Sequence, residues 1–139
     1  MISIIVITHG EFGAYLIEAA ESIVGVQHEG LKNISVSPRM SLDKIKSAIE
    51  NGMAEMQSPE GSVFMIDMPG GTPMNVVLPL VKDIPNTAVI CGVNINMLTS
   101  AFAYRKNLDF DRLVKKILED GKKAICEVKG LLLRGDSGQ

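Results

Sequence analysis

The sequence predicts an α/β fold with an open, doubly wound, mainly parallel sheet and helices on both of its faces. Short, β-branched apolar runs alternate with segments whose apolar residues recur at helical spacing, which is typical of parallel strands joined by right-handed crossovers. The first run, residues 2–8, is almost continuously apolar, as in a strand covered on both sides. We expect the strand order 2-1-3-4, with one further strand near the end of the chain. The expected strands are residues 2–8, 31–35, 62–67, 88–93 and 124–128.

The segments between these runs are expected to be helical. A first helix should stop at Gly25, and Ser41 should cap the second through its side-chain oxygen. A short helix is expected at residues 97–104, followed by a longer one that starts at Asp109. Each strand is thus followed by the helical segment that a parallel connection needs.

The turn after the third strand has the most explicit local sequence. In Gly70-Gly71-Thr72-Pro73 the two glycines permit positive φ, so the chain can turn sharply. Thr72 is expected to cap the third helix, with Pro73 at its first position, where the missing N–H costs nothing. Pro79 is expected to kink or shorten this helix.

The chain of 139 residues is expected to form one domain, residues 1–130, followed by a short tail, residues 131–139. A domain of this length buries roughly 68–70% of its unfolded surface, which is enough for one core. The composition, 46% hydrophobic and 22% charged residues, is that of a globular protein and not of a disordered one.

Charge and hydropathy exclude several classes of partner. The net charge is −2 and there is no basic run, so we expect no binding to nucleic acid or to anionic lipid. The apolar runs are too short to span a bilayer and the first lacks the features of a signal peptide, so we expect a cytoplasmic protein without membrane insertion. Cys91 and Cys126 are expected to be small buried hydrophobes, since their spacing fits neither a metal site nor a disulfide framework. We expect no metal and no cofactor.

His9 and Asp67 are expected to meet at one edge of the sheet. Ligands of open α/β sheets bind beyond the carboxyl ends of the strands, where neighbouring crossovers leave in opposite directions. With the order 2-1-3 this crevice lies between the first and third strands, which end at His9 and Asp67. A carboxylate that accepts one imidazole N–H leaves the other nitrogen free as a nucleophile. The pair therefore predicts a catalytic His9, oriented by Asp67, that can carry a phosphoryl group.

The residues around this pair are candidates for binding the phosphoryl group. Gly70, Gly71 and Thr72 offer backbone N–H groups, a hydroxyl and the positive end of a helix dipole. Thr8 and Gly10 flank His9 at the start of the first helix. Because each contact at a helix terminus contributes only about 0.3–1 kcal/mol, several must converge on the group.

Each feature also has a purely structural interpretation. A lone histidine after a strand is more often a turn residue, and Asp67 could simply cap a turn. The Gly-Gly-Thr-Pro turn lacks the Lys and the spacing of a Walker loop. His28 lies among polar residues and is expected to be exposed and inert. A histidine phosphatase is disfavoured, because Thr8 stands where its motif needs Arg.

Three separated segments together resemble the A component (EIIA) of mannose-class sugar phosphotransferase systems. They are Ile-Val-Ile-Thr-His-Gly at 5–10, Phe-Met-Ile-Asp at 64–67 with Gly-Gly-Thr-Pro-Met-Asn at 70–75, and Gly-Val-Asn-Ile-Asn-Met-Leu at 92–98. They occur in the family's order and span nearly the whole chain. The chain departs from the family at Pro69, where an aromatic residue is frequent, and at Asn96, where proline is frequent.

The resemblance implies a phosphohistidine relay. His9 falls on the family's phosphoacceptor, Asp67 on its partner and Thr72 on the hydroxyl residue near the phosphoryl group. Such a protein takes the group from the phosphocarrier protein HPr and gives it to the B component of a sugar transporter, without a cofactor. The resemblance also implies a homodimer that exchanges the last strand, residues 124–128. The chain has no attached B domain, so we expect a separate polypeptide as acceptor.

Two other functions remain open at this point. The protein could supply phosphate to a dihydroxyacetone kinase, as a related family does, although the Gly-Gly-Thr-Pro-Met-Asn segment favours the sugar branch. It could also be a regulatory module, not an enzyme, that is switched by phosphorylation of His9. The transported sugar cannot be read from the sequence, because a phosphate carrier need not touch the sugar.

Overall fold

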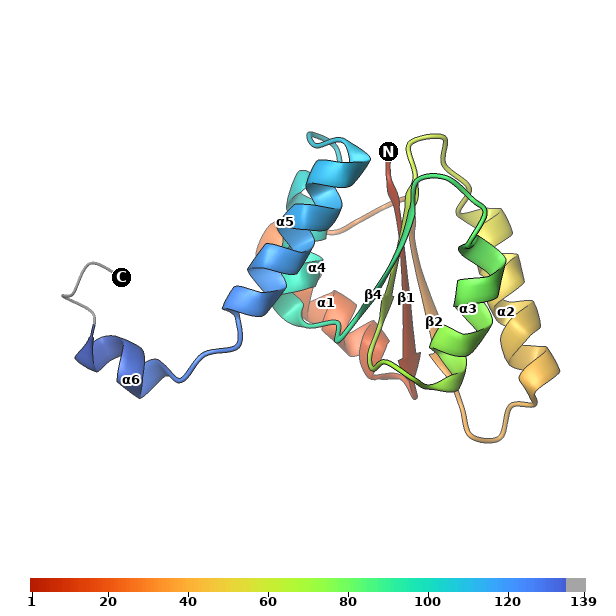
Figure 1. The fold of residues 1–139 in the computed structure, drawn as a ribbon, viewed down its shortest axis with the longest axis horizontal. Coiled ribbons are helices and arrows are strands. Elements are labelled where there is room, and N and C mark those ends of the chain that lie inside the picture. The colour runs from red at the N-terminus through yellow and green to blue at the C-terminus, as the bar shows by residue number, and fades with distance from the viewer. Residues whose placement is uncertain (135–139) are drawn as a thin grey trace.

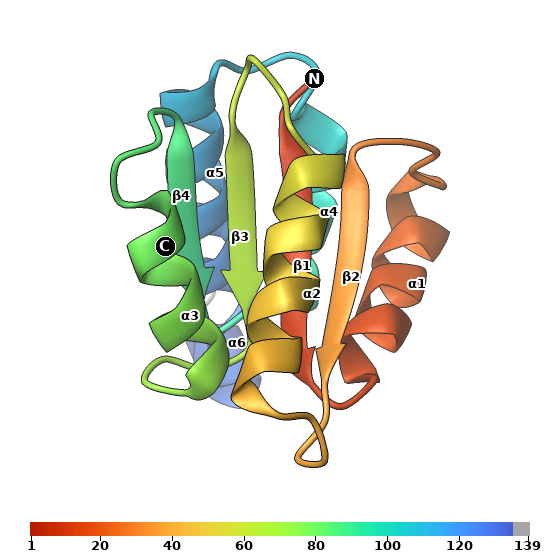
Figure 2. The same ribbon diagram turned by 90° about the vertical axis from the view of Figure 1, so that its right-hand side faces the viewer.

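A computed structural model describes residues 1–134, and its centre is a parallel four-stranded sheet (Figures 1 and 2). The strand order is β2-β1-β3-β4, as the sequence predicts. All three neighbouring pairs are parallel, and the register sets His9 beside Val36. The strands are β1 (Ser3–His9), β2 (Leu31–Val36), β3 (Ser62–Ile66) and β4 (Thr87–Cys91).

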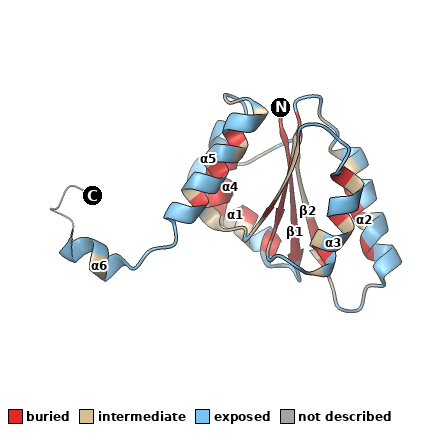
Figure 3. Cartoon of the chain, in the orientation of Figure 1, coloured by how far each residue is buried: buried red, intermediate tan, exposed pale blue. Residues whose placement is uncertain are grey.

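Helices cover both faces of the sheet, which explains the continuous apolar sequence of β1 (Figures 2 and 3). Ile4 and Val6 point into a core on one face, and Ile5 and Ile7 point into a second core on the other. The first core is covered by α1 (Phe12–Val24), α4 (Ile95–Tyr104) and α5 (Phe110–Lys123). The second is covered by α2 (Leu42–Glu55) and α3 (Thr72–Val81). Both faces of the sheet are therefore buried.

Two of the three expected helix starts agree with the structure, the cap at Ser41 and the start at Asp109. The Ser41 hydroxyl accepts the Lys44 N–H at 3.2 Å, and the Asp109 carboxylate caps α5. The third expectation was wrong by one residue, since Gly71 is the N-cap of α3 and Thr72 is already helical. Pro79 lies inside α3, which ends only two residues later at Val81.

The expected last strand at residues 124–128 is not formed in the single chain. Ala124 ends α5, and Val128 begins a separate helix, α6 (Val128–Leu133), which Figure 1 shows away from the sheet. A strand requires a neighbour for its backbone groups, and this segment has none within residues 1–134. Cys126 is consequently exposed and Cys91 only half-buried, so the expected burial of both was wrong. Of the predicted tail, residues 135–139 lie outside the described chain.

A buried arginine at the end of α4 forms hydrogen bonds with the backbone just before β1 and β2. Arg105, 2% exposed, donates to the carbonyl oxygens of Gly30 at 2.6 Å and Glu29 at 2.7 Å. It also donates to Gln27 Oε1 at 2.8 Å and to Ile2 O at 3.3 Å. Burial lowers the pKa of this guanidinium, and the nearby Glu29 charge opposes the shift. The side chain thus satisfies carbonyl groups from the start of β1 and the loop before β2.

Replacing Arg105 with methionine should therefore destabilise the fold. Arg105→Met keeps most of the apolar stem but leaves buried carbonyl groups without donors, so the free energy of unfolding should fall by about 2–4 kcal/mol. Urea unfolding followed by circular dichroism measures this. Arg112→Met is the matched control: the Arg112 side chain is 77% exposed, so its effect should stay below about 0.5 kcal/mol. An equal loss of unfolding free energy in the two variants would contradict a stabilising role for the Arg105 hydrogen bonds.

Candidate functional site

The structure brings His9 and Asp67 together at the carboxyl ends of β1 and β3. Asp67 Oδ2 lies 2.8 Å from His9 Nδ1 and also accepts the His9 backbone N–H at 2.9 Å. The other carboxylate oxygen accepts the Met68 N–H at 2.9 Å. The Asp67 side chain is 11% exposed and that of His9 is 46% exposed. One carboxylate therefore fixes both the backbone and the ring of a histidine that faces solvent.

This contact decides which imidazole nitrogen is free. An ionised carboxylate only accepts hydrogen bonds, so Nδ1 carries the proton and Nε2 keeps its lone pair. The Gly70-Gly71 turn lies beside that free nitrogen: a Cβ placed on Gly71 would be 3.6 Å from Nε2 and 3.3 Å from Cε1. Gly71 is thus packed against the open side of the ring.

Unpaired donors lie at the helix start that follows this turn. Within residues 1–134, the N–H groups of Gly71, Thr72 and Met74 and the Thr72 hydroxyl donate no hydrogen bond. They lie at the start of α3, where the helix dipole is positive and the first N–H groups have no partner in the helix. Such a terminus binds anions well. The arrangement can hold phosphoryl oxygens next to a nucleophilic nitrogen.

Two predicted phosphoryl-binding residues have other roles in this structure. Thr8 is fully buried, and its hydroxyl accepts the Gly13 N–H at 3.1 Å and donates to Gly10 O at 3.0 Å. The Gly10 N–H is bonded to Val36 O at 2.8 Å. Gly10 has φ of +69°, which glycine adopts without strain. Thr8 and Gly10 therefore shape the turn after β1, and neither offers a free polar hydrogen to a ligand.

Two sulfur-containing side chains that the sequence did not indicate lie next to the glycine turn. Met74 Sδ accepts the Gly70 N–H at 3.4 Å, and the Cys91 thiol lies 3.9 Å from the same sulfur. Burial, and secondarily the charge of Asp67, raises the pKa of the Cys91 thiol. Met74 stands four residues after Gly70 in a helical register, but no local pattern marks a thioether as an acceptor.

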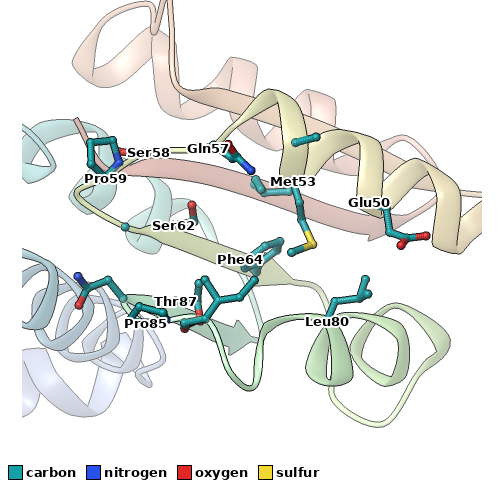
Figure 4. Close-up of a pocket in the computed structure, with 15 residues that line it drawn as sticks. Glu50, Met53, Gln57, Ser58, Pro59, Ser62, Phe64, Leu80, Pro85 and Thr87 are labelled. Atoms are coloured by element: carbon teal, nitrogen blue, oxygen red, sulfur yellow. Dashed lines mark hydrogen bonds between the residues drawn. The ribbon is translucent and has the colours of Figure 1, made fainter.

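A larger concavity lies away from this site. A groove of about 710 Å³ runs between α2 and α3 near the amino ends of β3 and β4, with Met53, Phe64 and Leu80 among its lining residues (Figure 4). Neither His9 nor Asp67 lines it. The groove is therefore separate from the histidine site.

Residues 1–134 contain neither a membrane-spanning helix nor a metal-binding cluster of side chains. No helix in this range is both long and apolar enough to cross a bilayer. The same residues contain no cluster of three or more His, Cys, Asp or Glu side chains that could hold a metal ion. His28 is exposed, as expected.

Adding a methyl group to Gly71 should restrict access to His9. Gly71 has φ of −91°, which alanine adopts without strain, so Gly71→Ala should fold normally while its Cβ crowds the ring. Carbethoxylation of His9 by diethyl pyrocarbonate should slow by roughly threefold, since the ring can shift only by tenths of an ångström. His28 is the internal control and should react at the same rate in both proteins. An unchanged His9 rate would contradict the packing of the turn on the ring.

The chain is similar to known proteins of one family. A family model described as the PTS system fructose IIA component matches residues 3–118. The PTS system mannose-specific EIIAB component of Escherichia coli (strain K12) is 30% identical over 129 residues, which are 92% of this chain and 40% of that protein. The chain thus spans less than half the length of this curated relative.

Solved structures show the same architecture. Phosphotransferase system component EIIA from Streptococcus agalactiae superimposes with a TM-score of 0.82 at 28% identity, covering 94% of this chain and 99% of that one. The PTS IIA protein associated with the fucose utilization operon of Streptococcus pneumoniae gives 0.83 at 22% identity, with 94% and 96% covered, which supports the fold alone. From the family match and these relatives, the chain belongs to the IIA components of mannose- and fructose-class phosphotransferase systems.

Proposed function

We propose that this chain is a cytoplasmic phosphohistidine carrier, which accepts a phosphoryl group from HPr on His9 Nε2 and transfers it to the B component of a sugar transporter. The observation that carries the proposal is the double contact of Asp67 Oδ2 with the backbone and ring of His9. This contact keeps the proton on Nδ1 and leaves Nε2 as the nucleophile at an exposed edge.

The transfer step follows from this arrangement. The Nε2 lone pair attacks phosphorus, a P–N bond forms, and the bond between phosphorus and the donor breaks. The ring becomes positively charged, and Asp67 stabilises that charge through the Nδ1–H contact. The N–H groups of Gly71, Thr72 and Met74 and the Thr72 hydroxyl are candidates to bind the phosphoryl oxygens. Onward transfer is the same step in reverse, with the B component as acceptor.

Labelling by phosphoenolpyruvate tests the carrier role directly. With the general enzyme and HPr present, the wild-type protein should gain acid-labile phosphate, His9→Ala should gain none, and His28→Ala should match the wild type. The His9 ring is 46% exposed, so His9→Ala should change stability by about 1 kcal/mol or less. Asp67→Asn should still label on His9 but about 10²-fold more slowly, because an amide can stabilise the wrong tautomer. Equal labelling of His9→Ala would refute the proposal.

A transfer assay with the phosphorylated protein distinguishes a phosphoryl carrier from a regulatory module. Transfer from phospho-His9 to a purified mannose-class B component should complete the relay. If labelled protein donates only to a dihydroxyacetone kinase, the donor chemistry stands and the sugar pathway is wrong. If it donates to neither but changes affinity for another protein when phosphorylated, the regulatory role replaces the carrier role.

We also propose that the chain forms a homodimer through its C-terminal segment, residues 124–133. Ile125 is 82% exposed, Leu132 77% and Leu133 80%, an unusual concentration of apolar surface. Within residues 1–134, β4 pairs only with β3, so its second edge has free backbone groups. The C-terminal segment of one subunit could therefore pair with the free edge of β4 in the other subunit, and the exchange would be mutual.

A charged residue in the segment should weaken this association. The double substitution Ile125→Asp, Leu132→Asp should raise the dimer dissociation constant by roughly tenfold or more, since it places charge in an apolar contact. Sedimentation velocity across a concentration series measures the shift. Val26→Asp changes a residue of similar exposure, 63%, in the loop after α1 and should leave the dimer intact. A wild-type protein that is monomeric at high micromolar concentration would refute the dimer.

A further inference from the structure

The glycine turn beside His9 is held in place by a sulfur atom. Gly70 adopts φ of +79°, and its N–H donates to Met74 Sδ at 3.4 Å. Among the described residues, Gly70 and Gly71 take part in one further hydrogen bond, in which Gly71 O accepts the Asn75 N–H at 3.1 Å. The turn itself is exposed at Gly70 and half-buried at Gly71. The thioether is therefore a large part of what fixes it.

The sulfur is itself anchored to the sheet. The Cys91 thiol, at the carboxyl end of β4, lies 3.9 Å from Met74 Sδ. Burial and the Asp67 charge raise the pKa of this thiol, so it stays protonated and can donate to the thioether. A continuous path then runs from β4 through Cys91 and Met74 to Gly70. It does not pass through Asp67, which orients the ring from its other side.

The position of this turn matters because of its distance from the ring. A Cβ on Gly71 would lie 3.3 Å from His9 Cε1, so a displacement of the turn by a fraction of an ångström changes what reaches Nε2. Reactions that depend on such alignment lose rate steeply when groups are misplaced. The N–H groups at the start of α3 can bind a group on Nε2 only while the turn stays in this position.

We propose that Met74 is a positioning residue for phosphoryl transfer: its thioether holds the Gly70-Gly71 turn against the open side of His9. The inference rests on the proposed carrier function for its consequence in rate, while the contact can be tested without it. The Met74 side chain does not touch the reacting atoms. Its effect reaches them through the backbone of the turn.

Two substitutions distinguish the role of the Met74 sulfur as a hydrogen-bond acceptor from the role of the side chain's volume. Met74→Leu keeps an apolar side chain of similar size but has no acceptor. Met74→Gln replaces the sulfur with a carbonyl oxygen of similar reach. Met53→Leu is the matched control, since the Met53 side chain lies in the distant groove and makes no hydrogen bond among the described residues. Urea unfolding checks that all three proteins are folded.

Hydrogen exchange of the Gly70 amide, measured by nuclear magnetic resonance, reads the contact itself. Exchange should be roughly fivefold faster in Met74→Leu, as wild-type in Met53→Leu, and largely restored in Met74→Gln. The maximal rate of labelling by phospho-HPr should fall about three- to tenfold in Met74→Leu, with KM for the donor unchanged, and should recover in Met74→Gln.

Several results would overturn the inference. Wild-type Gly70 exchange in Met74→Leu would show that the thioether does not hold the turn. Normal exchange but slow labelling in Met74→Gln would show that Met74 acts by packing. If the wild-type protein accepts no phosphoryl group, the carrier function fails, and Gly70 exchange with His9 carbethoxylation still decides whether Met74 holds the turn.

Discussion

One carboxylate oxygen organises the site. Asp67 Oδ2 accepts the backbone N–H and contacts the ring nitrogen of the same residue, His9, so it fixes where the chain leaves β1 and which way the imidazole points. Asp67 is in turn held by the Met68 N–H, which its other carboxylate oxygen accepts, and by its own N–H, which donates to Ile7 O of β1 at 3.3 Å. This oxygen therefore determines which ring nitrogen carries the proton and which one is free. A rigid parallel sheet makes such a contact possible, because it brings the carboxyl ends of β1 and β3 side by side.

The site also contains free N–H groups at a helix start, whose dipoles can bind an anion. The free N–H groups at the start of α3 come from Gly71, Thr72 and Met74. Each contact with a helix terminus is worth about 0.3–1 kcal/mol, so no single one of these donors would bind an anion tightly. That suits the proposed carrier, which has to give up the group it receives. Small displacements of the turn then matter more than the loss of any single charge.

The structure differs from several local expectations because of packing inside turns or because a neighbouring strand is missing from the described chain. Thr8 and Gly10 stand next to His9 in the sequence, yet their polar groups are used inside the turn, because buried polar atoms need partners. The cap of α3 moved from Thr72 to Gly71, a one-residue error that local propensity cannot resolve. The apolar segment at residues 124–128 has the composition of a strand, but a strand exists only where another offers its edge. Only the last of these outcomes depends on a neighbour that is absent from the described single chain.

The sequence by itself determined the alternation of strands and helices, the order 2-1-3-4 and the meeting of His9 with Asp67, because hydrophobic period and crossover handedness leave few topologies. The motifs at these positions also indicated the family, which the comparisons confirm. Tertiary structure alone decided which imidazole nitrogen is free, which N–H groups remain unpaired and that a thioether holds Gly70. These are matters of tenths of an ångström between side chains, and only the packed chain fixes them.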